Sequence, residues 1–214
     1  MEIFDISRTL SAELPPWPGD VPFRYRMNGR IAEGSSVNVG AIDMSLHNGT
    51  HADATFHFED DGWTMEKAEL PTYFGAAVVV DLASKYSGGE MPPITVADLS
   101  PIVDELRTAP RLLLKTNVWP DGSEFPKQIP VIAPEITPWL QARRVKLLGF
   151  DVPSVDKITS KDLPNHHALG RANINILESL DLRAVSSGRY SLAALPLKIA
   201  GGDGSPIRAI LWRE

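Results

Sequence analysis

Residues 47–57 read His47-Asn48-Gly49-Thr50-His51-Ala52-Asp53-Ala54-Thr55-Phe56-His57. Three of the five histidines and one carboxylate lie within these eleven residues. Imidazole nitrogen and carboxylate oxygen are common metal ligands, and this density of them is typical of a metal site. The alternative is a polar strand face that carries unrelated histidines.

The four polar side chains occupy the odd positions 47, 51, 53 and 57, and residues two apart in a strand point to one face. In a helix, Asp53 would lie about 200° round from His51. In a straight strand, His47 and His51 would be about 13 Å apart, at the limit for two imidazoles that share one ion. We therefore predict an extended segment with a bend at Gly49.

The composition indicates a globular protein. With 214 residues, of which 43% are hydrophobic and 22% charged, the chain is long enough for one substantial core, and we expect a single domain over 1–214. The net charge of -6 argues against nucleic acid as a partner. Acidic residues at the N-terminus and short apolar runs favour a cytoplasmic protein without a membrane partner.

The chain contains no cysteine. Disulfides, a thiolate nucleophile and sulfur ligands are therefore excluded. Nitrogen and oxygen would hold any metal, which leaves zinc, manganese and iron open.

Strand and helix patterns alternate along the chain and predict an α/β fold. Strands are expected at 3–7, 76–82, 111–116, 145–150, 190–199 and 207–212, with the last two paired across a tight turn at 201–205. Helices are expected to begin at Thr95 and Ser100 and to span 133–143. The apolar alternation in 37–46 reverses its phase, which predicts a bulge just before His47.

Three long connections, 83–93, 119–130 and 151–165, are either functional or plain surface loops. His166 and His167 follow the third of them, and Glu178 lies twelve residues after His166. These residues alone are weak evidence, because adjacent histidines in a loop are often solvated and Glu178 could be an exposed acid on a strand. They gain weight because a metal site at 47–57 needs further ligands from elsewhere.

A metal at these residues would favour hydrolysis. A bound metal lowers the pKa of water from about 15.7 to about 7. The chain lacks a G-x-S-x-G nucleophile elbow, so metal-assisted hydrolysis of a carbonyl compound is the expected reaction class. His57, furthest along the segment, could remain free as a proton carrier.

The string His47-x-Gly49-Thr50-His51-x-Asp53-x-x-x-His57, with Trp17-Pro18-Gly19-Asp20 upstream and His166 and Glu178 downstream, resembles the cyclase-like metal-dependent hydrolase family over nearly the whole chain. The resemblance implies a mixed β-sheet that forms a small barrel-like core with flanking helices, in a swivelling β/β/α-like arrangement, and a homodimer. The family often has proline two residues after the aspartate, where this chain has Thr55.

The resemblance also implies roles for individual residues. His47, His51 and Asp53 would bind one zinc ion, and His166 and Glu178 would form a second site that shares Asp53. Manganese is the alternative metal. The remaining roles are proton donor and acceptor for His57 and substrate contact for Trp17. The choice of His166 over His167 rests on the twelve-residue offset to Glu178.

The activity implied by the resemblance is hydrolysis of a non-peptide C–N bond, that of N-formyl-L-kynurenine, to L-kynurenine and formate in tryptophan degradation. Alternatives are a cyclic amide such as isatin, another small carbonyl compound, or a metal-binding protein without catalysis. An aromatic formamide would stack on Trp17, whereas packing or a dimer contact is the favoured role of Phe58, Trp63 and Trp119.

Overall fold

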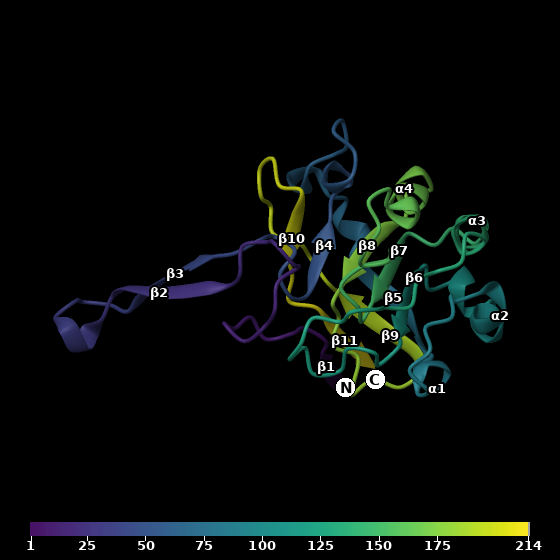
Figure 1. Cartoon of the computed structure of the whole chain (residues 1–214), viewed down its shortest axis with the longest axis horizontal. Coiled ribbons are helices and arrows are strands. Elements are labelled where there is room, and N and C mark those ends of the chain that lie inside the picture. Colours follow the sequence, from purple (N-terminus) through teal and green to yellow (C-terminus); the bar gives the residue numbers. More distant parts are fainter. Residues whose placement is uncertain (214) are drawn as a thin grey trace.

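A curled, mixed β-sheet forms the centre of the structure (Figure 1). The computed structural model describes residues 1–213. The strands are β1 (Glu2–Asp5), β2 (Arg24–Gly29), β3 (Val39–Asp43), β4 (His51–Asp53), β5 (Phe74–Asp81), β6 (Arg111–Lys115), β7 (Leu147–Phe150), β8 (Asn175–Glu178), β9 (Gly188–Ala193), β10 (Gly204–Pro206) and β11 (Ile210–Arg213).

In residues 1–213, nine of these strands form one sheet in the order β1-β11-β9-β5-β6-β7-β8-β4-β10. The four central strands β5 to β8 are parallel, and the strands on both sides of them are antiparallel. The sheet curls into a half barrel whose edges are β1 and β10. The predicted mixed α/β fold with a barrel-like sheet is confirmed.

The parallel strands are buried on both faces because their apolar side chains alternate between two cores. In β5, Val78 and Val80 pack in the core that contains the helices, whereas Ala77 and Val79 pack in the core on the other face. Each fully buried aliphatic side chain contributes about 1.5–3 kcal/mol of stability. The predicted strands at 76–82, 111–116 and 145–150 correspond to β5, β6 and β7.

The α-helices are short and lie to one side of the sheet in Figure 1. The α-helices are α1 (Ala83–Tyr86), α2 (Val96–Leu99), α3 (Ile136–Ala142) and α4 (Pro164–Arg171). The 3-10 helices are η1 (Ile31–Glu33), η2 (Thr55–His57), η3 (Met65–Lys67), η4 (Leu70–Thr72), η5 (Ser100–Ile102) and η6 (Glu105–Arg107). None of the helices within residues 1–213 has the length and apolar character needed to cross a membrane.

The helices predicted from the sequence are confirmed only in part. Thr95 and Asp98 form a capping box at the start of α2, as predicted. Ser100 begins only a 3-10 turn, and the segment predicted at 133–143 forms α3. Helix α4 was missed, because the histidine pair was placed in a loop. Pro164 occupies its first turn, where the missing N–H costs no hydrogen bond.

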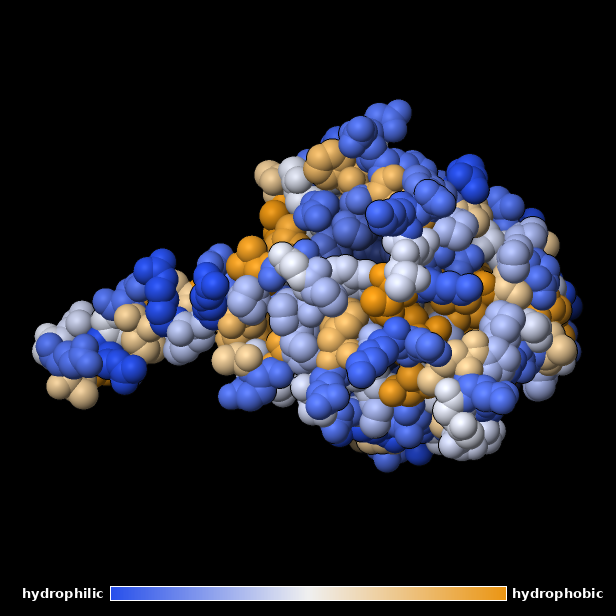
Figure 2. Space-filling view, viewed as in Figure 1, coloured by the Kyte–Doolittle hydropathy of each residue, from blue (hydrophilic) through white to orange (hydrophobic). Residues whose placement is uncertain are grey.

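Strands β2 and β3 form an arm, residues 24–43, that extends from the opposite side of the body (Figures 1 and 2). The predicted bulge before His47 is wrong: the register shift lies between Met27 and Gly29 in β2. Because the body covers neither face of the arm, Val39 and Ile42, which belong to opposite phases of the alternation, are both exposed.

The segment 47–57 bends and then extends, but it is not extended to its end. Gly49 has a φ of +67°, a conformation that favours glycine, so the predicted bend is confirmed. Strand β4 follows at His51–Asp53. The prediction of an extended chain up to His57 is wrong, because Thr55–His57 form η2, stabilised by hydrogen bonds from the Phe56 amide to Trp63 and from the Trp63 amide to the Thr55 hydroxyl.

The C-terminal hairpin is also more elaborate than predicted. Strand β9 pairs with β11, as expected, but the strands predicted at 190–199 and 207–212 are shorter: β9 ends at Ala193 and β11 begins at Ile210. The connection was predicted as a tight turn, but its residues Gly204–Pro206 form the additional edge strand β10, which pairs with β4. This pairing brings the C-terminal connection against the histidine segment.

Candidate metal centre

Strand β4 lies between β8 and β10, and the register of these strands assembles the centre of the site. His51 is directly opposite Glu178 of β8, and Asp53 is opposite Gly204 of β10. Residues directly opposite in an antiparallel pair have Cβ atoms about 4.5–5.5 Å apart. A Cβ at position 204 would lie 2.8 Å from His47 Cε1, so glycine is required there for the approach of this ring.

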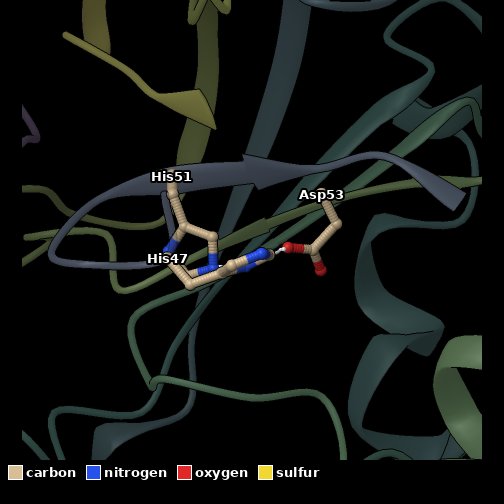
Figure 3. A group of neighbouring side chains, drawn as sticks. All are labelled: His47, His51 and Asp53. Carbon is tan, nitrogen blue, oxygen red and sulfur yellow. Dashed lines mark ion pairs between the residues drawn. The ribbon is translucent and has the colours of Figure 1, made fainter. Parts of the chain in front are cut away.

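His47, His51 and Asp53 form a first group of side chains (Figure 3). Asp53 Oδ1 lies 3.1 Å from His47 Nδ1 and 3.4 Å from His51 Nε2. The two rings meet edge to face with centroids 4.9 Å apart. The bend at Gly49 therefore has the effect predicted for it, since it brings two imidazoles four residues apart to one carboxylate.

Asp53, His166 and Glu178 form a second group that shares Asp53 with the first. His166 Nε2 lies 3.6 Å from Asp53 Oδ2 and 3.5 Å from Glu178 Oε1. His51 Nε2 lies 3.4 Å from Glu178 Oε2, which links the two groups. His167 is outside the site, with its Nδ1 3.5 Å from Glu59. The structure thus brings the five predicted ligands together and separates the two adjacent histidines.

The donor atoms of these residues fit a metal cation. Within residues 1–213, His51 Nε2 and both carboxylate oxygens of Asp53 are buried and have no hydrogen-bond partner. Ligands at about 2.05 Å from a tetrahedral zinc ion are separated from one another by about 3.3 Å. The separations of 3.1–3.6 Å between the donor atoms of each group match this value.

In each of the three predicted ligand histidines, one ring nitrogen is hydrogen-bonded to an acceptor on the protein. His51 Nδ1 donates to the Gly49 carbonyl at 2.9 Å, and His166 Nδ1 donates to Asp156 Oδ2 at 2.8 Å. His47 Nε2 donates to Asp203 Oδ2 at 3.0 Å. Because carbonyl and carboxylate oxygens only accept, these nitrogens carry the proton and the other nitrogen of each ring is free for a metal, as in metal sites with an outer carboxylate.

Asp156 and Asp203 are site residues that the sequence analysis missed. Asp156 lies in the 151–165 connection, where it also accepts hydrogen bonds from the amides of Asn165 and His166. The only signal in the sequence was the unusual length of this connection. Asp203 lies in the glycine-rich segment that was interpreted as a plain turn, and no local pattern distinguishes it.

The two buried carboxylates make the site strongly attractive to positive charge. Burial lowers the pKa of His51, but Asp53 and Glu178 outweigh burial and raise this pKa to about 10. Burial likewise opposes protonation of His166, whose pKa is nevertheless raised by Asp156, Asp53 and Glu178. In return, the three histidines hold the pKa of Asp53 well below its usual value despite its burial. A metal cation satisfies the same requirement for charge.

His57 stands at the edge of the two groups. Its ring stacks on His47 with centroids 3.9 Å apart, and its Nδ1 lies 3.7 Å from Asp203 Oδ2. His57 belongs to a third group with His47 and Asp203, so the geometry allows either a proton carrier or a further ligand. The side chain is one-third exposed, whereas those of His51 and His166 are buried.

Four of the five predicted ligand residues form the floor of a cavity of about 310 Å³: His47, His51, His166 and Glu178. Three aromatic rings line this cavity: Trp17 meets Phe125 edge to face with centroids 5.3 Å apart, and Phe125 is 5.9 Å from Trp119. Trp119 is buried and carries the Arg8 guanidinium 4.1 Å above its ring. Trp119 was expected only to pack, but it does both, and Phe125 was not singled out in the sequence.

Phe58 and Trp63 do not line this cavity. Phe58 packs against the rings of His166 and His167, at centroid distances of 5.4 and 5.6 Å, and against the core below the helices. Trp63 packs against the second core. These two rings therefore support the site from behind.

Comparisons with known proteins agree with this architecture. The family model described as "Putative cyclase" matches residues 4–157. The kynurenine formamidase of Geobacillus thermodenitrificans is 46% identical over 212 residues, which cover 97% of this chain and 95% of that protein.

Among solved structures, a potential metal-dependent hydrolase with cyclase activity has a TM-score of 0.78 and 26% identity, and the match covers 100% of this chain and 98% of that one. Isatin hydrolase A from Ralstonia solanacearum has a TM-score of 0.81 and 25% identity, with 98% and 91% of the two chains covered. The fold thus occurs with more than one named activity.

The hydrogen bond from His166 to Asp156 generates a first prediction. The substitution Asp156→Asn removes the charge that orients this ring and should lower metal affinity about 10–100-fold. The measurement is competitive titration of zinc against a chelator, with circular dichroism to confirm folding. Asp162→Asn, at an exposed position near α4, is the matched control and should bind as the unmodified protein does; equal affinity in both variants would contradict the role of Asp156.

Proposed function

The chain belongs to the cyclase family, and from this premise we propose that it is a metal-dependent hydrolase that converts N-formyl-L-kynurenine and water to L-kynurenine and formate, a step of tryptophan degradation. The observation that carries the proposal is the buried carboxylate of Asp53, whose unpartnered oxygens are shared by two groups of ligand residues. The full-length similarity to a kynurenine formamidase supports the choice of substrate.

Two zinc ions per chain are proposed, one held by His47, His51 and Asp53 and the other by Asp53, His166 and Glu178. The donor set of imidazole nitrogen and carboxylate oxygen also suits manganese. When bound, such an ion supplies a water of pKa near 7 and polarises the formyl carbonyl.

The residues of the chain position the substrate and move the proton. The rings of Trp17, Trp119 and Phe125 offer apolar walls to the aryl group, so the formamide is directed toward the cavity floor. His57 then accepts a proton from the attacking water and returns it to the aniline nitrogen as the C–N bond breaks. Asp203 Oδ2, 3.7 Å from His57 Nδ1, stabilises the positive charge that His57 gains during this transfer.

A homodimer is also part of the proposal, and the arm supports it. An isolated two-stranded hairpin is at best marginally stable in water. In the arm, Tyr25 and Ile42 are each 60% exposed, and contact with a second copy would cover them.

The first test of the function is a direct substrate comparison. The purified, zinc-loaded protein should release formate from N-formyl-L-kynurenine with a kcat/KM at least about tenfold higher than that for isatin, a difference of about 1.4 kcal/mol in transition-state binding. Formate is quantified enzymatically, and isatin opening is followed by absorbance. Equal values for the two substrates would overturn the assignment to the formamide.

The role of His57 is tested by His57→Ala. Loss of a positioned proton carrier should reduce kcat by about 10²–10⁴-fold, while the metal content remains that of the unmodified protein. The metal is counted by plasma mass spectrometry. If metal disappears together with activity, His57 is instead a ligand in the group with His47 and Asp203.

The same count of metal ions checks the two-ion proposal, which predicts two ions per chain. The proposal is contradicted if one ion per chain is found both before and after the substitution Glu178→Ala.

The arm is tested through the oligomeric state. The double substitution Tyr25→Asp and Ile42→Asp places charges on both exposed apolar positions of the arm and should convert the dimer to a monomer. Light scattering after size-exclusion chromatography gives the mass. A dimer that survives this substitution, or a monomeric unmodified protein, would exclude an arm-mediated homodimer.

A further inference from the structure

The rim of the cavity carries two opposite charges that the reaction does not use. Asp20 and Lys161 line the same cavity as four of the metal-ligand residues. They come from segments that are far apart in the sequence: Asp20 ends the proline-rich corner that contains Trp17, and Lys161 lies in the long connection before α4. Both residues are exposed.

These charges are free to bind a ligand. The lysines Lys85 and Lys115 form ion pairs with aspartates at 2.5 and 2.9 Å. Within residues 1–213, by contrast, neither the ammonium of Lys161 nor the carboxylate of Asp20 has an opposite charge within 4.0 Å. Solvent screens exposed charges, so Asp20 and Lys161 interact strongly only with a ligand that contacts them directly.

The carboxylate of Asp20 is held in place. The hydroxyl of Ser45 donates to Asp20 Oδ2 at 2.9 Å, and the amide of Asp20 donates to the Trp17 carbonyl at 2.9 Å. Ser45 Oγ also accepts from the His47 amide at 3.3 Å. These hydrogen bonds connect the turn that carries Trp17 and Asp20 to the segment that carries His47. They fix the position of the Asp20 carboxylate relative to the cavity floor.

The substrate under the proposed function has matching charges. N-formyl-L-kynurenine carries its formamide on the aryl ring and an α-ammonium and α-carboxylate at the end of the ketone side chain. With the formamide at the floor, the zwitterionic end points to the mouth, because burying unpaired charges is costly. Isatin has no ionic group to offer at this position.

We propose that Lys161 binds the α-carboxylate and Asp20 binds the α-ammonium, which makes the rim a subsite for the amino-acid end of an aryl substrate. This inference rests on the proposed function, which provides the zwitterion. The hydroxyl of Ser160, the neighbouring residue that also lines the cavity, adds a hydrogen-bond donor for the carboxylate.

The test measures binding of the product, so that it does not depend on turnover. Dissociation constants of the zinc-loaded protein are determined by calorimetry for L-kynurenine, for kynuramine, which lacks the carboxylate, and for 4-(2-aminophenyl)-4-oxobutanoate, which lacks the ammonium. L-Kynurenine should bind about tenfold more tightly than either analogue, as expected for one charge-assisted hydrogen bond.

The variants assign each charge to its partner. Lys161→Gln should weaken L-kynurenine about tenfold without a further loss for kynuramine, and Asp20→Asn should weaken L-kynurenine without a further loss for the analogue that lacks the ammonium. Lys157→Gln is the matched control, because Lys157 is an exposed lysine of the same connection that does not line the cavity.

The measured affinities and the release of formate distinguish a failure of the subsite from a failure of the proposed function. Equal affinity of the unmodified protein for all three ligands, or equal effects of a variant on all three, overturns the subsite. If the ligand pattern is as expected but no formate is released from N-formyl-L-kynurenine, the proposed function fails and the amino-acid subsite remains.

Discussion

The arrangement of this protein depends on the buried carboxylate of Asp53. Its two oxygens have no hydrogen-bond partner within residues 1–213, although burial of an uncompensated charge costs about 3–5 kcal/mol. Such an atom is stable only if positive charge is supplied, by protonated imidazoles or by a metal cation. Three histidines and a second carboxylate surround it, and the elements that carry them are arranged to deliver this charge.

The sheet satisfies this constraint through strand register. Because β4 lies between β8 and β10, one neighbour places Glu178 opposite His51 and the other allows His47 to approach Asp53 over Gly204. The connection before α4 then wraps around the site: the Val155 amide donates to Glu178 Oε1 at 2.9 Å, and Asp156 orients His166. A shift of one residue in either pairing would turn these side chains to the opposite face.

In the cavity above this centre, the residues for the proposed reaction and the residues for substrate recognition lie in different parts. Its floor consists of ionisable groups that exchange protons or bind a cation, and its walls are the aromatic rings of Trp17, Phe125 and Trp119. Its rim is again charged, because Asp20 and Lys161 line it and are exposed to solvent. This order of polar floor, apolar wall and charged rim matches an aromatic molecule with a reactive group at one end and an ionic group at the other, which is the chemical character of the proposed substrate.

The sequence by itself determined the elements whose signals are local. The spacing of His47, His51 and Asp53 with Gly49 predicted a bent, extended segment, and the apolar runs predicted β5, β6 and β7, because periodicity and a glycine conformation are properties of neighbouring residues. His166 and Glu178 were weak candidates from the sequence, and the family resemblance gave them their roles as ligands. The segment Thr55–His57 was predicted incorrectly, since η2 depends on hydrogen bonds with Trp63, eight residues from Thr55.

Only the tertiary structure decided which distant residues complete the site. Asp203 approaches His47 because β10 pairs with β4, and Asp156 approaches His166 because the connection folds back onto α4. The same holds for Phe125 in the cavity wall and for the charges of Asp20 and Lys161 at its rim. Asp20 belongs to a motif that the sequence analysis noted, but nothing in that motif gave it a role. The other residues stand in no recognisable spacing to the ligands, because strand pairing and loop packing are long-range interactions that leave no periodic pattern in the sequence.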